Sequence, residues 1–273
     1  MSEIYYYLLI PFSLSALGSL TFLYLFWRYE AVRLTFLMKH LAILQLLDFL
    51  LSFLWISFKL SLYPDELFCK LTSSMSYFLF VYQSYWLAVT SYYIYQVICI
   101  NKERNRTCLL RYSLICFIIS LATPIVDISL DCYTVESDKC VSICEGLSLL
   151  IDDLVFFCIF PFGYFISFFY NLKVLKRLKR DIQAPTMLMK ITFFRILIYP
   201  FITLLSMLPV FSYEIYYTFE GENIIYDFVA LTILGLMGLL YCIALGFTPE
   251  FIEAIRFHKR QVSSIISMKK LIS

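Results

Sequence analysis

Seven apolar stretches run through the chain, each about long enough to cross a bilayer, and they set the fold that it can adopt. A helix rises about 1.5 Å per residue, so roughly 20 apolar residues cross a hydrocarbon core about 30 Å thick. Inside that core only helices and closed barrels satisfy their own backbone hydrogen bonds. The sequence therefore predicts an all-α membrane protein, a bundle of seven transmembrane helices. We expect the spans at residues 5–27, 35–58, 71–100, 107–127, 147–172, 188–213 and 224–247.

Composition supports this interpretation, since 61% of the 273 residues are apolar and only 15% are charged. Residues 1–247 are expected to form one transmembrane domain, and residues 248–273 a cytoplasmic tail. The tail opens with Thr248, Pro249 and Glu250, which supply an N-cap, a first-turn proline and an acid suited to the helix dipole. Apolar and basic residues recur on opposite faces after them, which predicts an amphipathic eighth helix lying in the membrane surface.

The lysines and arginines indicate how the chain is oriented. Loops rich in these residues are retained on the cytoplasmic side. Of the 22 lysines and arginines, Lys59, Lys70 and Lys139 lie on one side, Arg195 lies within the sixth span, and all others lie on the opposite side. We therefore expect a multi-pass protein of the plasma membrane, with the N-terminus outside and the C-terminus in the cytoplasm.

Four of the nine cysteines are expected on the outer face. Cys69 lies where the third span begins, and Cys132, Cys140 and Cys144 lie in the loop after the fourth span. An extracellular setting permits disulfides, and four cysteines allow three full pairings that the sequence does not separate. We expect at least one bridge from Cys69 to that loop. The alternative is that some of these thiols stay free.

Seven spans, an outer N-terminus, a cysteine opening the third span and another in the next outer loop resemble the architecture of G-protein-coupled receptors. The run from Asp48 to Ser52, Asp-Phe-Leu-Leu-Ser, is similar to the second span of the slime-mould-type cyclic AMP receptor family. Arg195, Tyr199 and Pro200 resemble the Arg-x-x-x-Tyr-Pro segment in the sixth span of that family. The resemblance implies an extracellular ligand and a heterotrimeric G protein as partners.

The chain departs from related patterns at several points. Its fourth span has no tryptophan, although the cyclic AMP receptor family usually has one there. The third span ends at 95–99 as Tyr-Gln-Val-Ile-Cys, without the acid, arginine and tyrosine of rhodopsin-type receptors. The seventh span lacks both an Asn-Pro-x-x-Tyr motif and a lysine that could form a Schiff base with retinal. We therefore expect a receptor of this general architecture and assign it to no subclass.

Asp48 is the one acid placed near the centre of a span, where a charge costs roughly 2.5 to 3.5 kcal/mol on insertion scales. We expect it to face the bundle interior, as a polar switch or cation site shared with Ser52 and the glycines of the seventh span. The alternative is a hydrogen-bonded acid that only ties helices together. Arg195 and Tyr199 are expected to be coupling residues of the sixth span.

Cations at the cytoplasmic side offer a surface for G-protein coupling. In the third inner loop, apolar residues at helical spacing among the cations predict that the fifth helix continues beyond the membrane. The same cations could serve only as retention charge attracted to anionic lipid, and the sequence supports both interpretations equally. The candidate coupling residues are Arg104, Arg106, Lys176, Arg177, Lys179 and Arg180.

The expected outer face is acidic, which bears on the ligand. An acidic opening at the outer end of the bundle attracts a cation or a peptide amine and repels an anion, so electrostatics disfavour a cyclic nucleotide as the ligand. Most of these acids are expected only to solvate loops. Asp152, Asp153 and Asp227 are the candidate ligand-binding residues, because they lie at helix ends facing the mouth.

We therefore expect a G-protein-coupled receptor that transmits the binding of an extracellular ligand to a heterotrimeric G protein. Enzyme activity is not expected, because His40 and His258 both fall on the cytoplasmic side and no nucleophile, base or metal constellation is legible. No cofactor, metal or nucleic-acid partner is expected, and the lipid bilayer is the surrounding medium. The alternative is a seven-helix transporter or channel that uses Asp48, although we find no internal repeat of the kind transporters often show.

Overall fold

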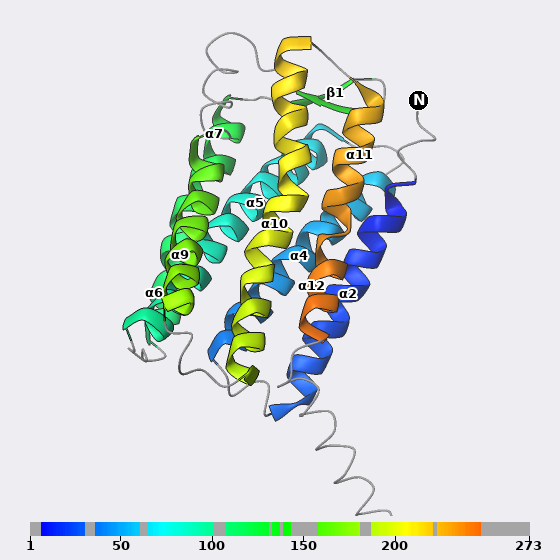
Figure 1. Cartoon of the computed structure of the whole chain (residues 1–273). Helices are drawn as coiled ribbons and strands as arrows, with labels where there is room; N and C mark the ends of the chain where they lie inside the picture. The colour runs from blue at the N-terminus through cyan, green and yellow to red at the C-terminus, as the bar shows by residue number, and fades with distance from the viewer. Residues whose placement is uncertain are drawn as a thin grey trace, which may run out of the picture.

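A computed structural model describes residues 7–30, 36–60, 65–100, 107–130, 133–136, 139–142, 158–180, 187–220 and 223–246. Long helices lie side by side as one bundle, with a two-stranded hairpin at one end (Figure 1). The elements are α2 (Leu9–Arg28), α4 (Phe36–Leu60), α5 (Glu66–Tyr95) with a π-helical turn (Gln96–Ile100), α6 (Thr107–Ser120), α7 (Ala122–Leu130), β1 (Tyr133–Glu136), β2 (Lys139–Ser142), α9 (Phe160–Arg180), α10 (Met187–Glu220), α11 (Ile224–Gly235) and α12 (Met237–Gly246).

The helices confirm the expected order of the spans. α6 with α7 forms the fourth span, and α11 with α12 forms the seventh. α9 continues to Arg180, so the predicted extension of the fifth helix is confirmed, whereas the expected start of that span at residue 147 lies outside the described residues. α10 runs to Glu220, beyond the expected end at residue 213. Residues 248–273, where the eighth helix was expected, also lie outside the described residues.

The spans differ in how apolar they are. Within the described residues, three helical segments are both long and apolar enough to cross a membrane, namely Leu9–Arg28, Met38–Ser57 and Ile224–Ala244. Leu110–Val126 and Ile198–Tyr213 are shorter apolar segments. The expectation of seven spans is therefore supported most clearly for these three segments, since the search covers the described residues alone.

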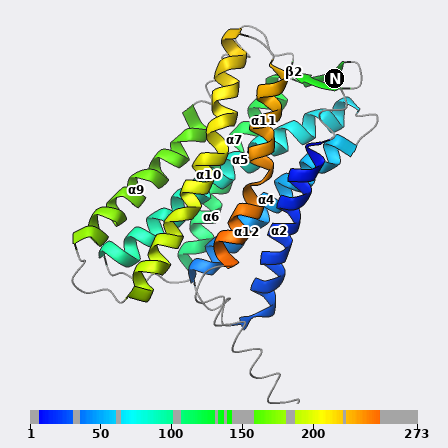
Figure 2. The same ribbon diagram turned by 45° about the vertical axis from the view of Figure 1, so that its right-hand side comes forward.

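The two ends of the bundle differ in charge. We name the end that carries β1 and β2 the hairpin end, and the opposite end, where α9 finishes and α10 starts, the basic end (Figures 1 and 2). Asp65, Glu66 and Asp227 begin helices at the hairpin end. Arg28 lies in the last turn of α2 at the basic end, where the cations of α9 also lie.

α5 is the central helix of the bundle. It packs along α9, α4 and the α6–α7 pair, while α2 packs against α4 and α12. Trp86 on α5 is fully buried and its indole N–H donates to the backbone carbonyl of His40 on α4, 2.9 Å away. The His40 ring stacks on Trp86 with 5.1 Å between ring centroids. This contact fixes α4 against α5 near the basic end.

The fourth span is interrupted at Leu121, between α6 and α7. Pro124 has no N–H to give to the carbonyl of Ser120, four residues earlier. The hydroxyl of Thr123 donates to that carbonyl instead, at 2.9 Å. A side chain thus replaces the backbone donor, as bundled membrane helices require at a proline.

α5 and α9 approach so closely that one position accepts only glycine. A Cβ atom on Gly163 of α9 would lie 2.7 Å from the backbone carbonyl carbon of Ser84 on α5, and equally close to its hydroxyl oxygen. Real Cβ contacts are essentially never that short. Small residues at helix interfaces permit this kind of backbone packing in membranes.

We predict that Gly163→Ala forces α9 away from α5 and lowers the free energy of unfolding by about 1–3 kcal/mol, the usual cost of overpacking. Thermal unfolding of the purified full chain in detergent measures the effect as a lower Tm. Phe165→Leu is the matched control, because Phe165 is 69% exposed on the bilayer side of the same helix. Equal Tm values for the two variants would contradict the close packing.

Candidate functional site

Asp48 lies in the middle of α4 and is 2% exposed, so it faces the bundle interior as expected. Two serines of α2 point at it. The Ser15 hydroxyl donates to Asp48 Oδ2 at 2.9 Å, and the Ser19 hydroxyl donates to the same oxygen at 2.8 Å. Residues four apart share one face of a helix, so α2 presents both donors together.

The third helix that contributes to this site is α12, which begins just after a break in the seventh span. The helix is interrupted at Leu236, whose N–H turns back to the carbonyls of Ile233 and Leu234. The N–H of Gly238 donates to Ser15 Oγ at 2.8 Å. Gly238, Ser15, Ser19 and Asp48 thus form one chain of hydrogen bonds across three helices, which we name the Asp48 network.

Only glycine fits at position 238, because no room is left beside Asp48 for a side chain. A Cβ atom there would collide with Asp48 Oδ2 and would lie 2.5 Å and 2.6 Å from the hydroxyl oxygens of Ser19 and Ser15. Gly18 on α2 is similarly close to α12, because its Cβ would lie 2.9 Å from the Cα of Leu239. Glycines on both helices therefore let α12 approach close enough to join the network.

A second polar contact ties α10 to α12, one turn beyond Gly238. The hydroxyls of Thr203 and Tyr241 are hydrogen-bonded, and the Thr203 hydroxyl donates to the carbonyl of Tyr199 at 3.0 Å. The rings of Tyr199 and Tyr241 lie 5.7 Å apart between centroids. Tyr199, expected as a coupling residue, is therefore buried beside α12. Arg195 lies one turn earlier on α10, and its side chain is outside the described ones.

The sequence indicated part of this arrangement. It predicted Asp48 and the glycines of the seventh span as neighbours, whereas Ser15 and Ser19 were missed. Two serines four residues apart in an apolar span are the signal that could have identified them. Ser52 lies one turn from Asp48 on α4 and is 2% exposed, but no described hydrogen bond joins it to the network.

The candidate coupling and ligand-binding residues are only partly described. Lys176 and Arg177 are exposed on α9, and Asp227 is half-buried in the first turn of α11 at the hairpin end. Lys179 and Arg180 fall in the last turn of α9, with side chains outside the described ones. Arg104, Arg106, Asp152 and Asp153 lie outside the described residues.

Cys69 lies in the first turns of α5, which Asp65 caps by accepting from the N–H of Phe68 at 2.7 Å. Its side chain is fully buried and disulfide-bonded. Cys140 lies in β2, opposite Val135 of β1. The partner of Cys69 is not among the described side chains, and Cys132 and Cys144 lie outside the described residues.

Comparison with known proteins extends the description of the fold. No protein-family model matches the chain, and no curated protein matches its sequence. The structure is similar to the crystal structure of squid rhodopsin, with a TM-score of 0.75 and 17% sequence identity, over 96% of this chain and 87% of that one. The chain has a rhodopsin-like fold. At this identity the likeness concerns the fold alone, and the resemblance to cyclic AMP receptors stays a prediction from sequence.

We predict that Ser15→Ala destabilises the protein more than Ser19→Ala. Ser15 serves as a donor to Asp48 and as the acceptor for the Gly238 N–H, so its loss leaves a buried amide unpaired, at about 1–3 kcal/mol. Ser19 is only a donor, worth about 0.5–1.5 kcal/mol net. Thermal unfolding in detergent measures both.

Thr21→Ala is the control for this comparison. Thr21 is on the same helix, is exposed, and donates only to the carbonyl of Leu17 within α2. A larger loss of Tm in Ser19→Ala than in Ser15→Ala would show that the contact with α12 does not contribute as described.

Proposed function

We propose that the chain is a G-protein-coupled receptor, which transmits the binding of an extracellular ligand to a cytoplasmic heterotrimeric G protein. The observation that carries the proposal is the rhodopsin-like arrangement of helices over 96% of the chain. The cyclic AMP receptor-like residues of the second and sixth spans add to it, because Asp48 and Tyr199 are both buried at contacts between helices.

The basic end faces the cytoplasm in this proposal, and the protein resides in the plasma membrane. Among the described residues, Lys59, Lys70 and Lys139 are the cations of the hairpin end, whereas Arg28, Arg111 and the cations of α9 lie toward the opposite end. Retention of basic segments on the cytoplasmic side supports an outer N-terminus.

The end of α9 is the proposed coupling surface. Lys176 and Arg177 are exposed there, and the helix continues past them to Arg180. Lys173, one turn earlier, is also exposed, and its ammonium lies 4.2 Å from the ring centroid of Phe169 in a cation–π contact. Arg104 and Arg106 complete the surface in the proposal.

The Asp48 network is the proposed intramembrane switch. It joins α2, α4 and α12, and Tyr241 joins α12 to Thr203 on α10 one turn later. A displacement of α10 therefore changes a hydrogen bond adjacent to the network. Arg195 and Tyr199 lie on the same helix and belong to this proposed route.

The ligand is proposed to enter at the hairpin end. The described part of that end carries more acids than its three lysines, namely Asp65, Glu66, Asp127, Glu136, Glu214, Glu220 and Asp227. This excess favours a cation or a peptide amine over an anion. Asp152 and Asp153 are proposed to add to the same site.

The geometry at Asp48 disfavours the rival proposal of a transporter or channel. Asp48 Oδ2 already accepts two hydroxyl donors from the protein, and Gly238 packs directly against it. An ion moving past Asp48 would have to displace three helices that contact one another closely.

Nucleotide exchange tests the receptor. We predict that the purified full chain in nanodiscs of neutral lipid accelerates exchange on at least one class of Gα subunit. The double variant Lys176→Glu/Arg177→Glu is expected to lower that rate at least about fivefold, since it reverses two exposed charges at the proposed interface. Neutral lipid removes attraction to anionic headgroups as an explanation.

Lys59→Glu/Lys70→Glu is the control, because it makes the same change of net charge at the hairpin end and should leave exchange unchanged. Solute or ion flux into liposomes that Asp48→Asn abolishes, without exchange on any Gα class, would support the transporter and refute the receptor.

Cys140 is the proposed partner of Cys69. β1 packs against α5, and Cys140 lies directly opposite Val135 of β1 in the hairpin. We predict that non-reducing peptide mapping recovers Cys69 linked to Cys140. Cys69→Ser and Cys140→Ser should each lower the free energy of unfolding by about 2–4 kcal/mol, and the double variant by no more than either. A peptide linking Cys69 to Cys132 or Cys144 would refute this pairing.

A further inference from the structure

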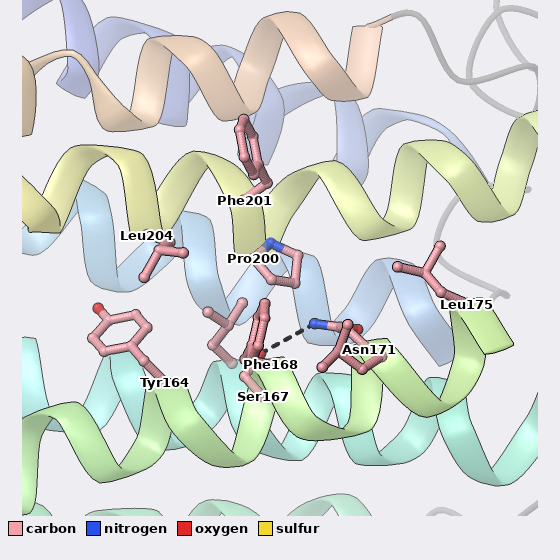
Figure 3. A pocket seen from close by; sticks show the side chains of 10 residues that line it. Tyr164, Ser167, Phe168, Asn171, Leu175, Pro200, Phe201 and Leu204 are labelled. Atoms are coloured by element: carbon pink, nitrogen blue, oxygen red, sulfur yellow. Dashed lines mark hydrogen bonds between the residues drawn. The ribbon is translucent and has the colours of Figure 1, made fainter.

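One described cleft lies between α9 and α10 (Figure 3). Asn171 lines it, with its Nδ2 donating to Ser167 Oγ at 3.4 Å, and Pro200 and Phe201 line it from α10. Among the described residues that line this cleft, none is charged. An uncharged, apolar cleft accepts many different bodies, so its chemistry selects no particular occupant.

A groove of different chemistry lies between α2 and α4 at the basic end, where the two helices pack against each other (Figures 1 and 2). Its volume is about 590 Å³, within the roughly 300–1,000 Å³ of small-ligand sites. We name it the α2–α4 groove. The residues that line it include Leu23, Phe26 and Trp27 of α2 and Lys39, Ala42 and Leu46 of α4.

The α2–α4 groove opens to the bilayer and begins at the level of the headgroups. Trp27 is 76% exposed in the last turn of α2, and tryptophan is enriched where hydrocarbon meets headgroups. From Lys39 to Leu46 the lining extends about 10 Å along the axis of α4, away from the basic end. Leu46 is 45% exposed, so the deeper part of the groove also faces lipid. An acyl chain therefore reaches the groove directly from the bilayer.

Lys39 distinguishes the α2–α4 groove from the cleft. Its side chain is half-buried, and no described residue forms an ion pair or a hydrogen bond with its ammonium. Glu30, the acid that follows α2, is exposed and does not line the groove. Partial removal of a charge from water is unfavourable unless an opposite charge compensates it. The groove is therefore apolar along its length and cationic at the headgroup end, which favours an anion there.

An acidic phospholipid matches both parts of the groove. Its phosphate lies at the headgroup level, where Trp27 and Lys39 lie, and its acyl chains lie in the hydrocarbon beyond. A zwitterionic phospholipid matches less well, because its own cation neutralises the phosphate. Arg28, exposed in the last turn of α2, adds a second positive charge at the same end. Basic pockets between transmembrane helices on the cytoplasmic side bind acidic headgroups in this way.

The tail of the chain complements the groove poorly. Residues 248–273 carry more cations than acids, namely Arg256, Lys259, Arg260, Lys269 and Lys270 against Glu250 and Glu253. Because like charges repel, Lys39 favours an acidic lipid over this segment.

We propose that the α2–α4 groove binds one acidic phospholipid, with the headgroup phosphate paired to Lys39 and an acyl chain packed along Phe26 and Leu46. In the proposed orientation the headgroup lies in the cytoplasmic leaflet, where acidic lipids are concentrated. The proposal rests on the groove and its cation, so failure of the chain to activate any G protein would leave it intact.

Photolabelling of the full chain tests the site. The chain is placed in nanodiscs of phosphatidylcholine that contain a small fraction of phosphatidylserine with a photoreactive acyl chain. We expect saturable labelling that maps to residues 23–27 and 39–46 and that unlabelled phosphatidylserine competes. A phosphatidylcholine probe with the same photoreactive chain should label these residues at least about fivefold less, the effect of one lysine beside an acidic headgroup.

Variants of Lys39 test the contact with the headgroup. Lys39→Gln should reduce labelling by the phosphatidylserine probe at least about fivefold, and Lys39→Arg should retain it, because arginine also pairs with phosphate. Arg111→Gln is the matched control, since it removes one exposed cation of α6 toward the same end but outside the groove. Labelling of the groove in this control should change less than about twofold, because salt screens distant charges.

A pair of tryptophan variants tests the groove itself. Leu46 and Leu50 lie one turn apart on α4 and are 45% and 40% exposed, but only Leu46 lines the groove. Leu46→Trp should abolish labelling while Lys39 stays intact, whereas Leu50→Trp should preserve it. This pair keeps the test decisive even where Lys39→Gln fails to fold.

Several outcomes would overturn the proposal. They are equal labelling by the two lipid probes, equal labelling of the Lys39→Gln and Arg111→Gln variants, and equal labelling of the two tryptophan variants. Labelling by a photoreactive fatty acid but not by phosphatidylserine would assign the groove to a different anion. A cross-link from the groove to residues 248–273, without lipid labelling, would assign it to the tail of the chain.

Discussion

Satisfaction of polar groups inside hydrocarbon is the constraint on which the described structure depends. No water is present at that depth to bond an exposed N–H or carbonyl, so each must find a partner within the protein. The helices meet this requirement along most of their length, and hydroxyl side chains meet it where the helices are interrupted. Thr123 bonds the carbonyl that Pro124 leaves, and Ser15 bonds the N–H of Gly238 after the break at Leu236.

The break in the seventh span shows how one irregularity organises several helices. Because Gly238 donates to Ser15, α12 is bonded to α2, and because Ser15 and Ser19 both donate to Asp48, α2 is bonded to α4. A residue larger than glycine at position 238 would push α12 away from α2 and α4. Asp48 was expected to act either as a switch or as a residue that only ties helices together, and these contacts show that it ties them. The further contact between Tyr241 of α12 and Thr203 of α10 supports the proposal of a switch.

Apolar length and charge made the spans predictable, because the bilayer imposes both on any helix that crosses it. The burial of Asp48 was predictable for the same reason, since an acid at that depth has few alternatives to the interior. The spacing of Ser15 and Ser19 is visible in the sequence, but their contact with Asp48 is not. The interruption at Leu236 was not predictable either. Which helix faces touch depends on the rotation of each helix about its axis. The seventh span is interrupted at Leu236 although no proline in the sequence indicates a break there. The cleft beside Asn171 likewise depends on the gap between two helices, which no local pattern records.

α10 lies between the Asp48 network and the cleft that separates it from α9. On one side Thr203 bonds it to Tyr241 of α12, next to the Asp48 network, and on the other side the cleft separates it from α9. Interiors packed at high density resist displacement, whereas a helix with a gap beside it can move with less loss of contacts. Displacement of α10 toward α9 would close the cleft and strain the contact between Thr203 and Tyr241.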